Sequence, residues 1–279
     1  MSTTRDLARK AKARVHAATA PRHQYEPEPE THWEVGVTDA KLSGWFLEES
    51  DELYRGFPIS ADDVVVDVGC GDGGHMAFCA NRGAHVIAVD IDTDALAKAK
   101  DRLVNSKARK VDVFDAPAEH LPVEDGFATR VVCNEVLEHV DDPRVVVAEL
   151  VRIAAPGALF LITCPDSLHE QMQSYIAPPS YFEKPNHIRK IERDELVEWF
   201  SDAGLEILDT STYAFYWSIW WALFWAADGV DLDDADHPLL NQWSALWSTL
   251  LSTEQGRRLK SQLDQFLPKS QVLLARKPA

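Results

Sequence analysis

The stretch from Val64 to Asp90 constrains the fold of this chain more than any other. An apolar, β-branched run at Val64–Val68 leads into a turn with four glycines in six positions. A helical pattern follows, and a second apolar run then ends at the carboxylate of Asp90. Glycines allow a sharp turn and a close approach to a ligand, and an acid at that place hydrogen-bonds ribose hydroxyls. The pattern therefore predicts a strand–turn–helix–strand unit that holds a nucleoside.

Two features of this turn favour different nucleosides. Gly69, Gly71 and Gly74 have the GxGxxG spacing of nicotinamide and flavin dinucleotide sites, so such a dinucleotide is one candidate. Asp67, however, stands two residues before the first glycine. A carboxylate there does nothing for a pyrophosphate, whereas it suits the ammonium group of an amino-acid ligand, directly or through water. The acid therefore favours a nucleoside that carries an amino acid.

Four segments in order along the chain resemble the class I S-adenosylmethionine-dependent methyltransferases. They are DVGCGDG at 67–73, AVD at 88–90, FDAPAEHLP at 114–122 and NEVLEHV at 134–140. They are most similar to the branch that methylates small molecules and quinone precursors. The resemblance implies S-adenosylmethionine as cofactor and an α/β fold. That fold is Rossmann-like and doubly wound, with helices on both faces of a mostly parallel seven-stranded sheet whose final strand is an antiparallel edge.

Apolar runs alternate with helical patterns along most of the chain, which is typical of a parallel sheet covered on both faces. We expect a basic, disordered arm and linker at 1–30, a core at 31–209 plus 269–279, and a helical insertion at 210–268 before the last strand. The expected strands are 64–68, 85–89, 110–114, 128–133, 158–163, 205–209 and 271–275, and the expected helices are 38–54, 74–82, 94–105, 142–154 and 192–203.

The insertion at 210–268 contains six of the nine tryptophans. Five of its aromatic residues have the spacing of one helical stripe. Such a stripe serves either as a lid or wall for a substrate, or as a hydrophobic seam against the core or a second subunit. The seam is favoured, because a whole stripe exceeds what one small ligand covers. A homo-oligomer formed through this insertion is therefore expected. The stripe comprises Trp217, Trp220, Trp221, Phe224 and Trp225.

Composition limits which binding partners and which cellular compartment we expect for this protein. The net charge of −17 speaks against nucleic acid or an anionic membrane as the main partner, which leaves a small-molecule substrate. The longest apolar run, at 213–227, is shorter than the roughly 20 residues that a membrane-spanning helix needs. The cysteines form no CxxC pair, which is typical of buried thiols in the reducing cytoplasm. They are Cys70, Cys79, Cys133 and Cys164.

Ligands of open parallel sheets lie beyond the carboxyl ends of the strands. Combined with the resemblance, this rule implies that Asp90 holds the ribose hydroxyls, Ile91 packs on the adenine and Asp115 accepts from its amino group. Asp115 is equally well explained as a surface residue near a turn, because FDAPAEHLP is longer than the usual family segment. The expected cofactor-binding residues are Asp67, Gly69, Cys70, Gly71, Gly73, Asp90, Ile91, Asp115, Ala116 and Asn134.

Methyl transfer to a hydroxyl requires a base, and an imidazole suits that role at neutral pH. His139 follows the fourth expected strand, near the place where the resemblance puts the methyl group. Glu135 stands four residues earlier, so on a helix it would share a face with His139 and orient its ring. The alternative is that His139 only caps or packs this turn.

The segment between the fifth strand and the next helix is about twenty-five residues long, which is unusual without a function. Its tyrosines and amide suit a polar substrate, and Arg189 suits a carboxylate. Asp166, His169 and His187 form a candidate set for a divalent cation such as Mg²⁺. The expected substrate residues are Asp166, Tyr175, Tyr181, Asn186, His187 and Arg189.

These observations predict an S-adenosylmethionine-dependent methyltransferase that O-methylates a small polar metabolite. A sugar or a glycosylated hydroxy acid such as glucosylglycerate is the first expectation for the acceptor. A phenolic quinone precursor or an amine is the alternative within the same class. An NAD(P)-dependent oxidoreductase and a non-catalytic, cofactor-binding interaction module are the alternatives outside it.

Overall fold

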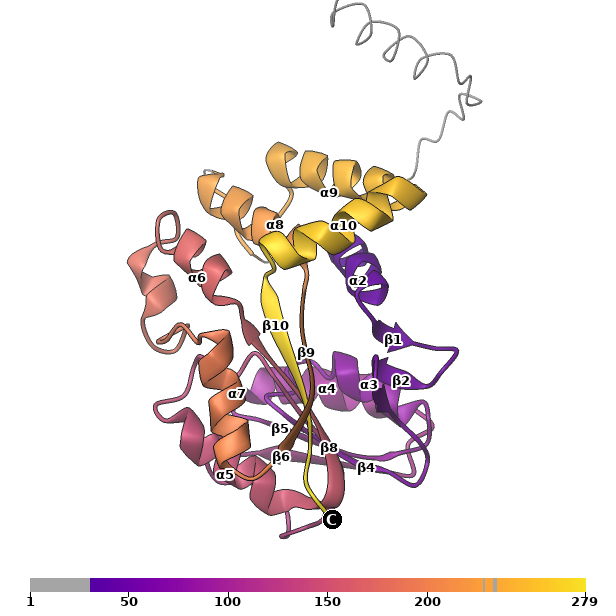
Figure 1. The fold of residues 1–279 in the computed structure, drawn as a ribbon. Coiled ribbons are helices and arrows are strands. Elements are labelled where there is room, and N and C mark those ends of the chain that lie inside the picture. Colours follow the sequence, from indigo (N-terminus) through magenta and orange to yellow (C-terminus); the bar gives the residue numbers. More distant parts are fainter. Residues whose placement is uncertain (1–30, 228, 233–234) are drawn as a thin grey trace, which may run out of the picture. The chain divides into compact units, whose positions relative to one another are not determined.

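The computed structural model describes residues 31–227, 229–232 and 235–279, so the arm predicted at 1–30 lies outside the described residues. A seven-stranded sheet with the order β6-β5-β4-β7-β8-β10-β9 forms its centre (Figure 1). β10 runs antiparallel to both of its neighbours, and the pairings among β6, β5, β4, β7 and β8 are parallel. The strands are β4 (Val64–Val68), β5 (His85–Asp90), β6 (Lys110–Asp115), β7 (Ala128–Asn134), β8 (Ala154–Pro165), β9 (Glu206–Tyr213) and β10 (Ser270–Arg276).

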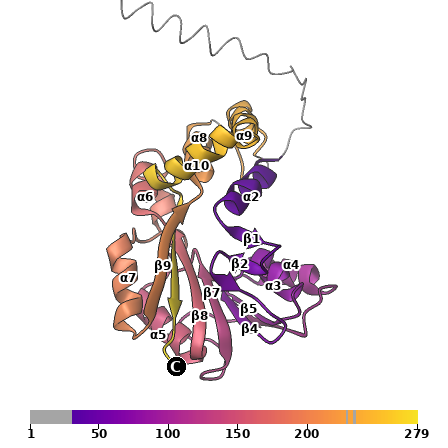
Figure 2. The same ribbon diagram turned by 45° about the vertical axis from the view of Figure 1, so that its right-hand side comes forward.

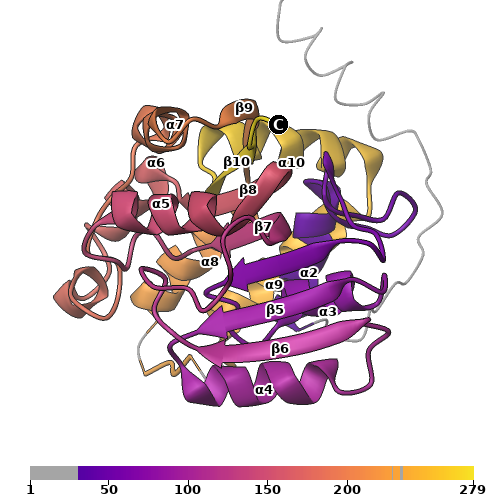
Figure 3. The ribbon, with the colours of Figure 1, turned by 90° about the horizontal axis from the view of Figure 1, so that it is seen from below.

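Helices cover both faces of this sheet, as predicted (Figure 3). Successive side chains of a strand point to opposite faces, so Val66 packs with α5 and α7 while Val65 packs with α3 and α4. Both valines are fully buried, which explains why the strand is a continuous apolar run instead of an alternating one. The helices are α3 (Gly74–Ala80), α4 (Thr93–Leu103), α5 (Pro143–Ile153) and α7 (Arg193–Asp202).

The prediction of a helix at 38–54 is wrong. A capping box at Thr31 starts α2 (His32–Leu42) earlier, and Gly44, with a φ of +108°, follows the end of the helix. Three short strands then form a separate small sheet that packs beside α3. They are β1 (Trp45–Leu47), β2 (Glu52–Tyr54) and β3 (Phe57–Pro58).

The last strand is not at the edge of the sheet as expected, because β10 lies between β8 and β9. β9 also continues to Tyr213, four residues into the predicted insertion, where Ser270 is its register partner. Beyond Tyr213 the insertion is helical, as predicted, and its helices gather above the β9–β10 pair (Figure 2). The helices are α8 (Phe215–Ala226), α9 (Pro238–Leu251) and α10 (Glu254–Phe266).

These three helices and α2 build a core of their own around Tyr216, Trp220 and Trp247. Lys260 of α10 is buried beside it and pairs with two buried aspartates, Asp39 of α2 and Asp264 of α10. Between β8 and α7 the chain forms α6 (Ser167–Gln173) and a short 3-10 helix, Pro179–Phe182. Among the described residues, no helix has both the length and the apolar character needed to cross a membrane.

Candidate functional site

The carboxyl ends of β4, β5, β6 and β7 bring the predicted cofactor residues to one edge of the sheet (Figure 3). Asp90 at the end of β5 is the register partner of Asp115 at the end of β6. The Gly71 N–H donates to Asp90 Oδ2 at 2.8 Å, and the Asp92 N–H donates to Oδ1 at 2.9 Å. Asp90 therefore holds the glycine-rich turn in place while its carboxylate keeps further acceptor capacity.

The glycine-rich turn requires glycine at two positions. Gly69 has a φ of +71°, and an added Cβ would stand 2.3 Å from the Val136 side chain. Gly73 has a φ of +81°, and its Cβ would stand 3.0 Å from Ala99. A Cβ on Gly71 would meet no atom within 4 Å, so the space over the middle of the turn is open to a ligand.

Two buried side chains at this turn have acceptor oxygens without a hydrogen-bond partner among the described residues. Asp67 is 1 % exposed, and neither of its carboxylate oxygens is bonded within the part of the chain that the structure describes. Burial, with the charge of Asp90 adding to it, raises the pKa of Asp67 to about 8. Asn134 Oδ1 also lacks a partner, although its amide nitrogen lies 3.1 Å from His75 Nδ1. Orphaned buried acceptors are rare, and here they fit a ligand with a cationic N–H donor.

The remaining predicted cofactor residues also lie at this edge. The Ile91 side chain is 69 % exposed and offers an apolar surface for a base. Asp115 is exposed, and the Ala116 N–H donates to the backbone carbonyl of Asp90 at 3.1 Å. Cys70 is buried and contacts the carbonyl of Gly71, so it supports the turn. The donors, acceptors and open space around the turn fit S-adenosylmethionine, whose sulfonium supplies an activated methyl group.

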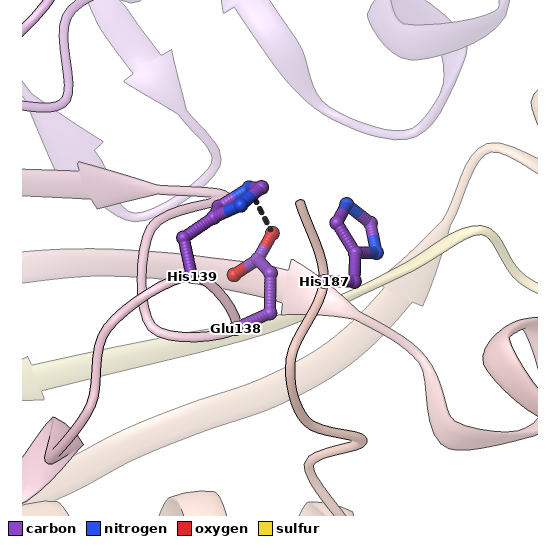
Figure 4. Close-up of side chains that lie close together, drawn as sticks. All are labelled: Glu138, His139 and His187. Atoms are coloured by element: carbon purple, nitrogen blue, oxygen red, sulfur yellow. Dashed lines mark ion pairs between the residues drawn. The ribbon is translucent and has the colours of Figure 1, made fainter. Parts of the chain in front are cut away.

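His139 lies in the turn after β7, beside Glu138 and His187 (Figure 4). Its Nδ1 is 3.0 Å from the carbonyl oxygen of Pro185. A carbonyl only accepts, so Nδ1 carries the proton and Nε2 keeps its lone pair. Burial lowers the pKa of His139, and His187 lowers it further, which favours the neutral ring. The ring therefore has the tautomer and charge of a general base.

Glu135 does not orient His139, so that prediction is wrong. Residues 136–141 form turns instead of a helix, and the Pro185 carbonyl orients the ring. The Glu135 carboxylate accepts from Thr163 Oγ1 at 3.0 Å and pairs with Lys269. Burial alone would raise the pKa of Glu135, but the charge and hydrogen bond of Lys269 bring it below its usual value.

Glu138 is 1 % exposed, and neither carboxylate oxygen has a hydrogen-bond partner in residues 31–227, 229–232 and 235–279. Burial, with the charge of Glu135 adding to it, raises the pKa of Glu138 well above its usual value. Glu138 Oε1 lies 3.7 Å from His139 Nε2 (Figure 4). Glu138, His139 and His187 each offer one ligand atom, and these atoms lie within 4.8 Å of one another.

The cation set predicted from the sequence is wrong. Asp166 caps α6 and pairs with Arg193 at 2.7 Å, so its carboxylate is already used. His169 is buried in α6 against Gln173, and burial lowers its pKa well below the usual value. Of the predicted set, only His187 belongs to the group that could hold a cation among the described residues.

Two neighbouring cavities open beside this edge. The first, which we call the aromatic cavity, measures about 380 Å³, and the second, which we call the histidine cavity, about 400 Å³. Trp221 and Lys269 line both. The aromatic cavity is lined by Trp33, Gly36, Val37, Ala40, Trp45, Phe46, His75, Glu135, Tyr213, Ala214, Trp217, Trp221, Lys269 and Ser270. The histidine cavity is lined by Pro178, Ser180, Tyr181, Asn186, His187, Trp221, Phe224, Trp225, Leu232 and Lys269.

The structure brings three of the predicted substrate residues, Tyr181, Asn186 and His187, to the histidine cavity. His187 Nδ1 lies 3.1 Å from a carboxylate oxygen of Glu170, and the Tyr181 hydroxyl donates to the other oxygen at 3.0 Å. This hydrogen-bonded pair fixes both rings beside the tryptophans of α8.

Asp166, Tyr175 and Arg189 are not brought to either cavity. Tyr175 is 79 % exposed after the end of α6. Arg189 donates to the carbonyls of Val140 and Asp141, both at 2.7 Å, and so clamps the turn that carries His139. Its expected role as a partner of a substrate carboxylate is therefore wrong.

The sequence reasoning missed Lys269, His75 and the pair Trp45–Phe46. His75 stacks on both aromatic rings, with centroids 5.0 Å and 5.7 Å away. The signal for His75 was its place directly after the glycine-rich turn. Lys269 stands immediately before the last strand, and because that strand is antiparallel, its start lies where the parallel strands end.

Comparisons with known proteins identify the family of the chain. A family model described as a methyltransferase domain matches residues 66–162. A ubiquinone biosynthesis O-methyltransferase of Pseudomonas paraeruginosa is 35% identical over 197 residues, which are 64% of this chain and 84% of that protein. One from Colwellia psychrerythraea is 29% identical over 160 residues, or 54% of this chain. The chain spans 63% of the length of that relative and of two others.

Solved structures share the fold at low sequence identity. A geranyl diphosphate methyltransferase in complex with S-adenosylmethionine has a TM-score of 0.55 at 18% identity, covering 90% of this chain and 93% of that one. The cyclase SpnF has a TM-score of 0.56 at 19% identity, covering 98% and 93%. The sheet order, with its antiparallel β10, also differs from the 3-2-1-4-5-6 order of dinucleotide-binding folds. The chain belongs to the class I S-adenosylmethionine-dependent methyltransferases.

Proposed function

We propose that this protein transfers a methyl group from S-adenosylmethionine to a hydroxyl oxygen of a small acceptor, with His139 as the base. The observation that carries the proposal is the hydrogen bond from His139 Nδ1 to the Pro185 carbonyl, which leaves Nε2 ready to take a proton. The cofactor is already activated. The remaining work of the protein is to align the acceptor and remove its proton.

The lining of the cavities supports an acceptor with a flat aromatic body, such as a phenol. Trp45, Phe46 and Trp217 line the first cavity, and Phe224 and Trp225 line the second. Aromatic walls of this kind bury apolar rings and stack on them. The 35% identical relative is named a ubiquinone biosynthesis O-methyltransferase, which agrees with a phenolic acceptor. The sugar acceptor predicted first has less support, because two of the polar residues meant to bind it, Asp166 and Arg189, have other partners.

Substitution of His139 tests the base. His139→Ala is expected to lower kcat by about 10²–10⁴-fold, because a positioned general base contributes on that scale. Affinity for S-adenosylhomocysteine, measured by calorimetry, should change less than about twofold. His120→Ala, an exposed histidine on a turn, is the matched control and should leave both quantities unchanged. Turnover of His139→Ala near the wild-type rate would remove His139 as the base.

The acceptor class is tested on the wild-type protein with a panel of phenols and sugars of similar size. Phenols should be methylated with the higher kcat/KM. A preference for sugars would overturn the phenolic acceptor while leaving O-methylation in place. Binding of NADPH without binding of S-adenosylhomocysteine would overturn the whole proposal.

The group of Glu138, His139 and His187 supports a second candidate mechanism, in which a divalent cation binds the acceptor oxygen. The specific observation is the buried Glu138 carboxylate, which accepts no hydrogen bond from the described residues and lies beside both histidines. The His139 base predicts that treatment with EDTA leaves turnover unchanged. Loss of turnover that added Mg²⁺ restores would favour the cation instead.

A further inference from the structure

Lys269 is held firmly at the place where the two cavities meet. Its backbone N–H donates to the Tyr213 carbonyl at 3.0 Å, and its carbonyl accepts from the Asp166 N–H at 2.9 Å. Both bonds link it to neighbouring segments at the edge where β7 and β8 end. Its side chain reaches the lining of both cavities, and no other lysine or arginine is among the described residues that line them.

The ammonium group of Lys269 has hydrogen-bonding capacity to spare. It can donate three hydrogen bonds, and among the described residues Glu135 accepts one of them. Burial alone would lower the pKa of Lys269, but Glu135, Glu138 and Glu170 raise it above its usual value, so the group stays charged. A charged donor with unused capacity therefore faces the space for the acceptor.

A purely structural ion pair between Lys269 and Glu135 is the simpler explanation, and two observations argue against it. The pair is partly buried, with 18 % of the Lys269 side chain and 28 % of the Glu135 side chain exposed. Exposed and buried ion pairs alike contribute little net stability, so stability alone gives no reason to place one here. Glu135 also has a φ of +54°, a left-handed conformation that is strained for residues other than glycine. Such strain is characteristic of functional sites. Here it accompanies the pair that borders both cavities.

We propose that Lys269 is a catalytic residue that binds the acceptor oxygen and stabilises the negative charge that develops on it. This inference rests on the proposed O-methyl transfer. In the reaction the acceptor proton passes to His139 Nε2, an oxygen lone pair forms the new O–CH₃ bond, and the electrons of the broken C–S bond stay on sulfur. Lys269 keeps its protons throughout. Glu135, in turn, holds the ammonium group in place.

The groups that face the ammonium define its electrostatic setting. Glu135 and Glu138 come from the segment after β7, Glu170 from α6, and His187 from the loop before α7. Glu170 is already bonded by Tyr181 and His187. Among the described residues the ammonium donates to Glu135 alone, so two donors remain for the acceptor. An ionised oxygen should bind there better than a neutral one.

The test uses 4-nitrophenol as a probe, because its ionised form absorbs visible light. It is bound to the wild-type protein together with S-adenosylhomocysteine, and the absorbance is followed against pH. Binding near Lys269 should raise the ionisation constant of the phenol at least about tenfold over that of the free compound, since a neighbouring opposite charge acts on this scale. No turnover is required, so the measurement does not depend on methyl transfer.

Three variants separate binding of the acceptor oxygen by Lys269 from a merely structural role of its ion pair with Glu135. Glu135→Gln combined with Lys269→Met removes both charges without leaving a buried carboxylate unpaired, and it should abolish the tenfold effect. Lys269→Arg should retain most of it, and Glu135→Gln alone should retain it because the cation remains. S-adenosylhomocysteine affinity should stay within about twofold in all three, which verifies folding.

Each outcome decides a different question. Equal ionisation constants for bound 4-nitrophenol in the wild type and the double variant would overturn the role of Lys269 and leave the proposed function intact. Failure of the wild-type protein to bind any phenol of the panel would overturn the phenolic acceptor, and the inference about Lys269 with it.

Discussion

Replacing Asp67 with asparagine should move folding stability and cofactor affinity in opposite directions. Asp67 is buried without a hydrogen-bond partner among the residues that the structure describes, and burial raises its pKa from 3.8 to about 8. Near pH 7 the unfolded chain carries this carboxyl ionised, whereas the folded protein keeps it mostly protonated. Each pH unit above 3.8 stabilises the unfolded state relative to the folded state by roughly 1.4 kcal/mol. Near pH 7 the difference amounts to on the order of 4 kcal/mol. Asparagine has a similar shape and does not ionise, so it should stabilise the free protein by up to that amount.

The sign of the pH dependence follows from the same values. A carboxyl with a raised pKa in the folded state binds its proton more tightly there than in the unfolded chain. The free energy of unfolding should therefore fall as the pH rises from about 4 to about 8 and level off above that. Urea denaturation of the free wild-type protein should show this slope, and Asp67→Asn should lack the part due to Asp67. Asp101→Asn, an exposed position on α4, is the control.

Cofactor binding should respond in the other direction. The ammonium group of the ligand needs the ionised carboxylate, so the wild-type protein near pH 7 should release close to one proton on binding S-adenosylhomocysteine. Asp67→Asn should release almost none and bind about 10–100-fold more weakly, the loss expected for a charged hydrogen bond. Calorimetry in two buffers of different ionisation enthalpy measures both quantities. A destabilised variant with unchanged affinity would refute the assignment of Asp67.

Three further substitutions test the geometry. Asp90→Ala should weaken S-adenosylhomocysteine binding at least about tenfold by calorimetry, because the side chain fixes the glycine-rich turn and is expected to accept from the ribose. An unchanged dissociation constant would show that the ribose does not bind at Asp90. Gly36→Ala should lose about 1–3 kcal/mol in urea denaturation, since the new Cβ would lie 2.3 Å from the Trp217 ring; a gain, usual for this change in a helix, would contradict the contact. Lys260→Met should lose about 3–5 kcal/mol by leaving two buried carboxylates unpaired, and neutralising both should recover part of that loss.

Local sequence patterns were sufficient to predict the strands and the turn that carry the expected cofactor residues. The strand Val64–Val68 was predicted with its observed bounds, because a short β-branched run that ends in glycines has few other solutions. The helix at 38–54 failed because a glycine and a tight turn divide that stretch, and the aromatic residues that follow pair as short strands. Their apolar spacing is compatible with either structure.

The sequence by itself determined the family, the parallel strands and the edge at which the predicted cofactor residues meet, because each depends on residues close together in the chain. The tertiary structure alone decided which side chains are free to act. Asp166 and Arg189 have partners elsewhere, and Glu135 meets Lys269 across 134 positions. Hydrogen bonds and ion pairs over such separations leave no periodic signal, since they depend on how strands and loops are placed in space.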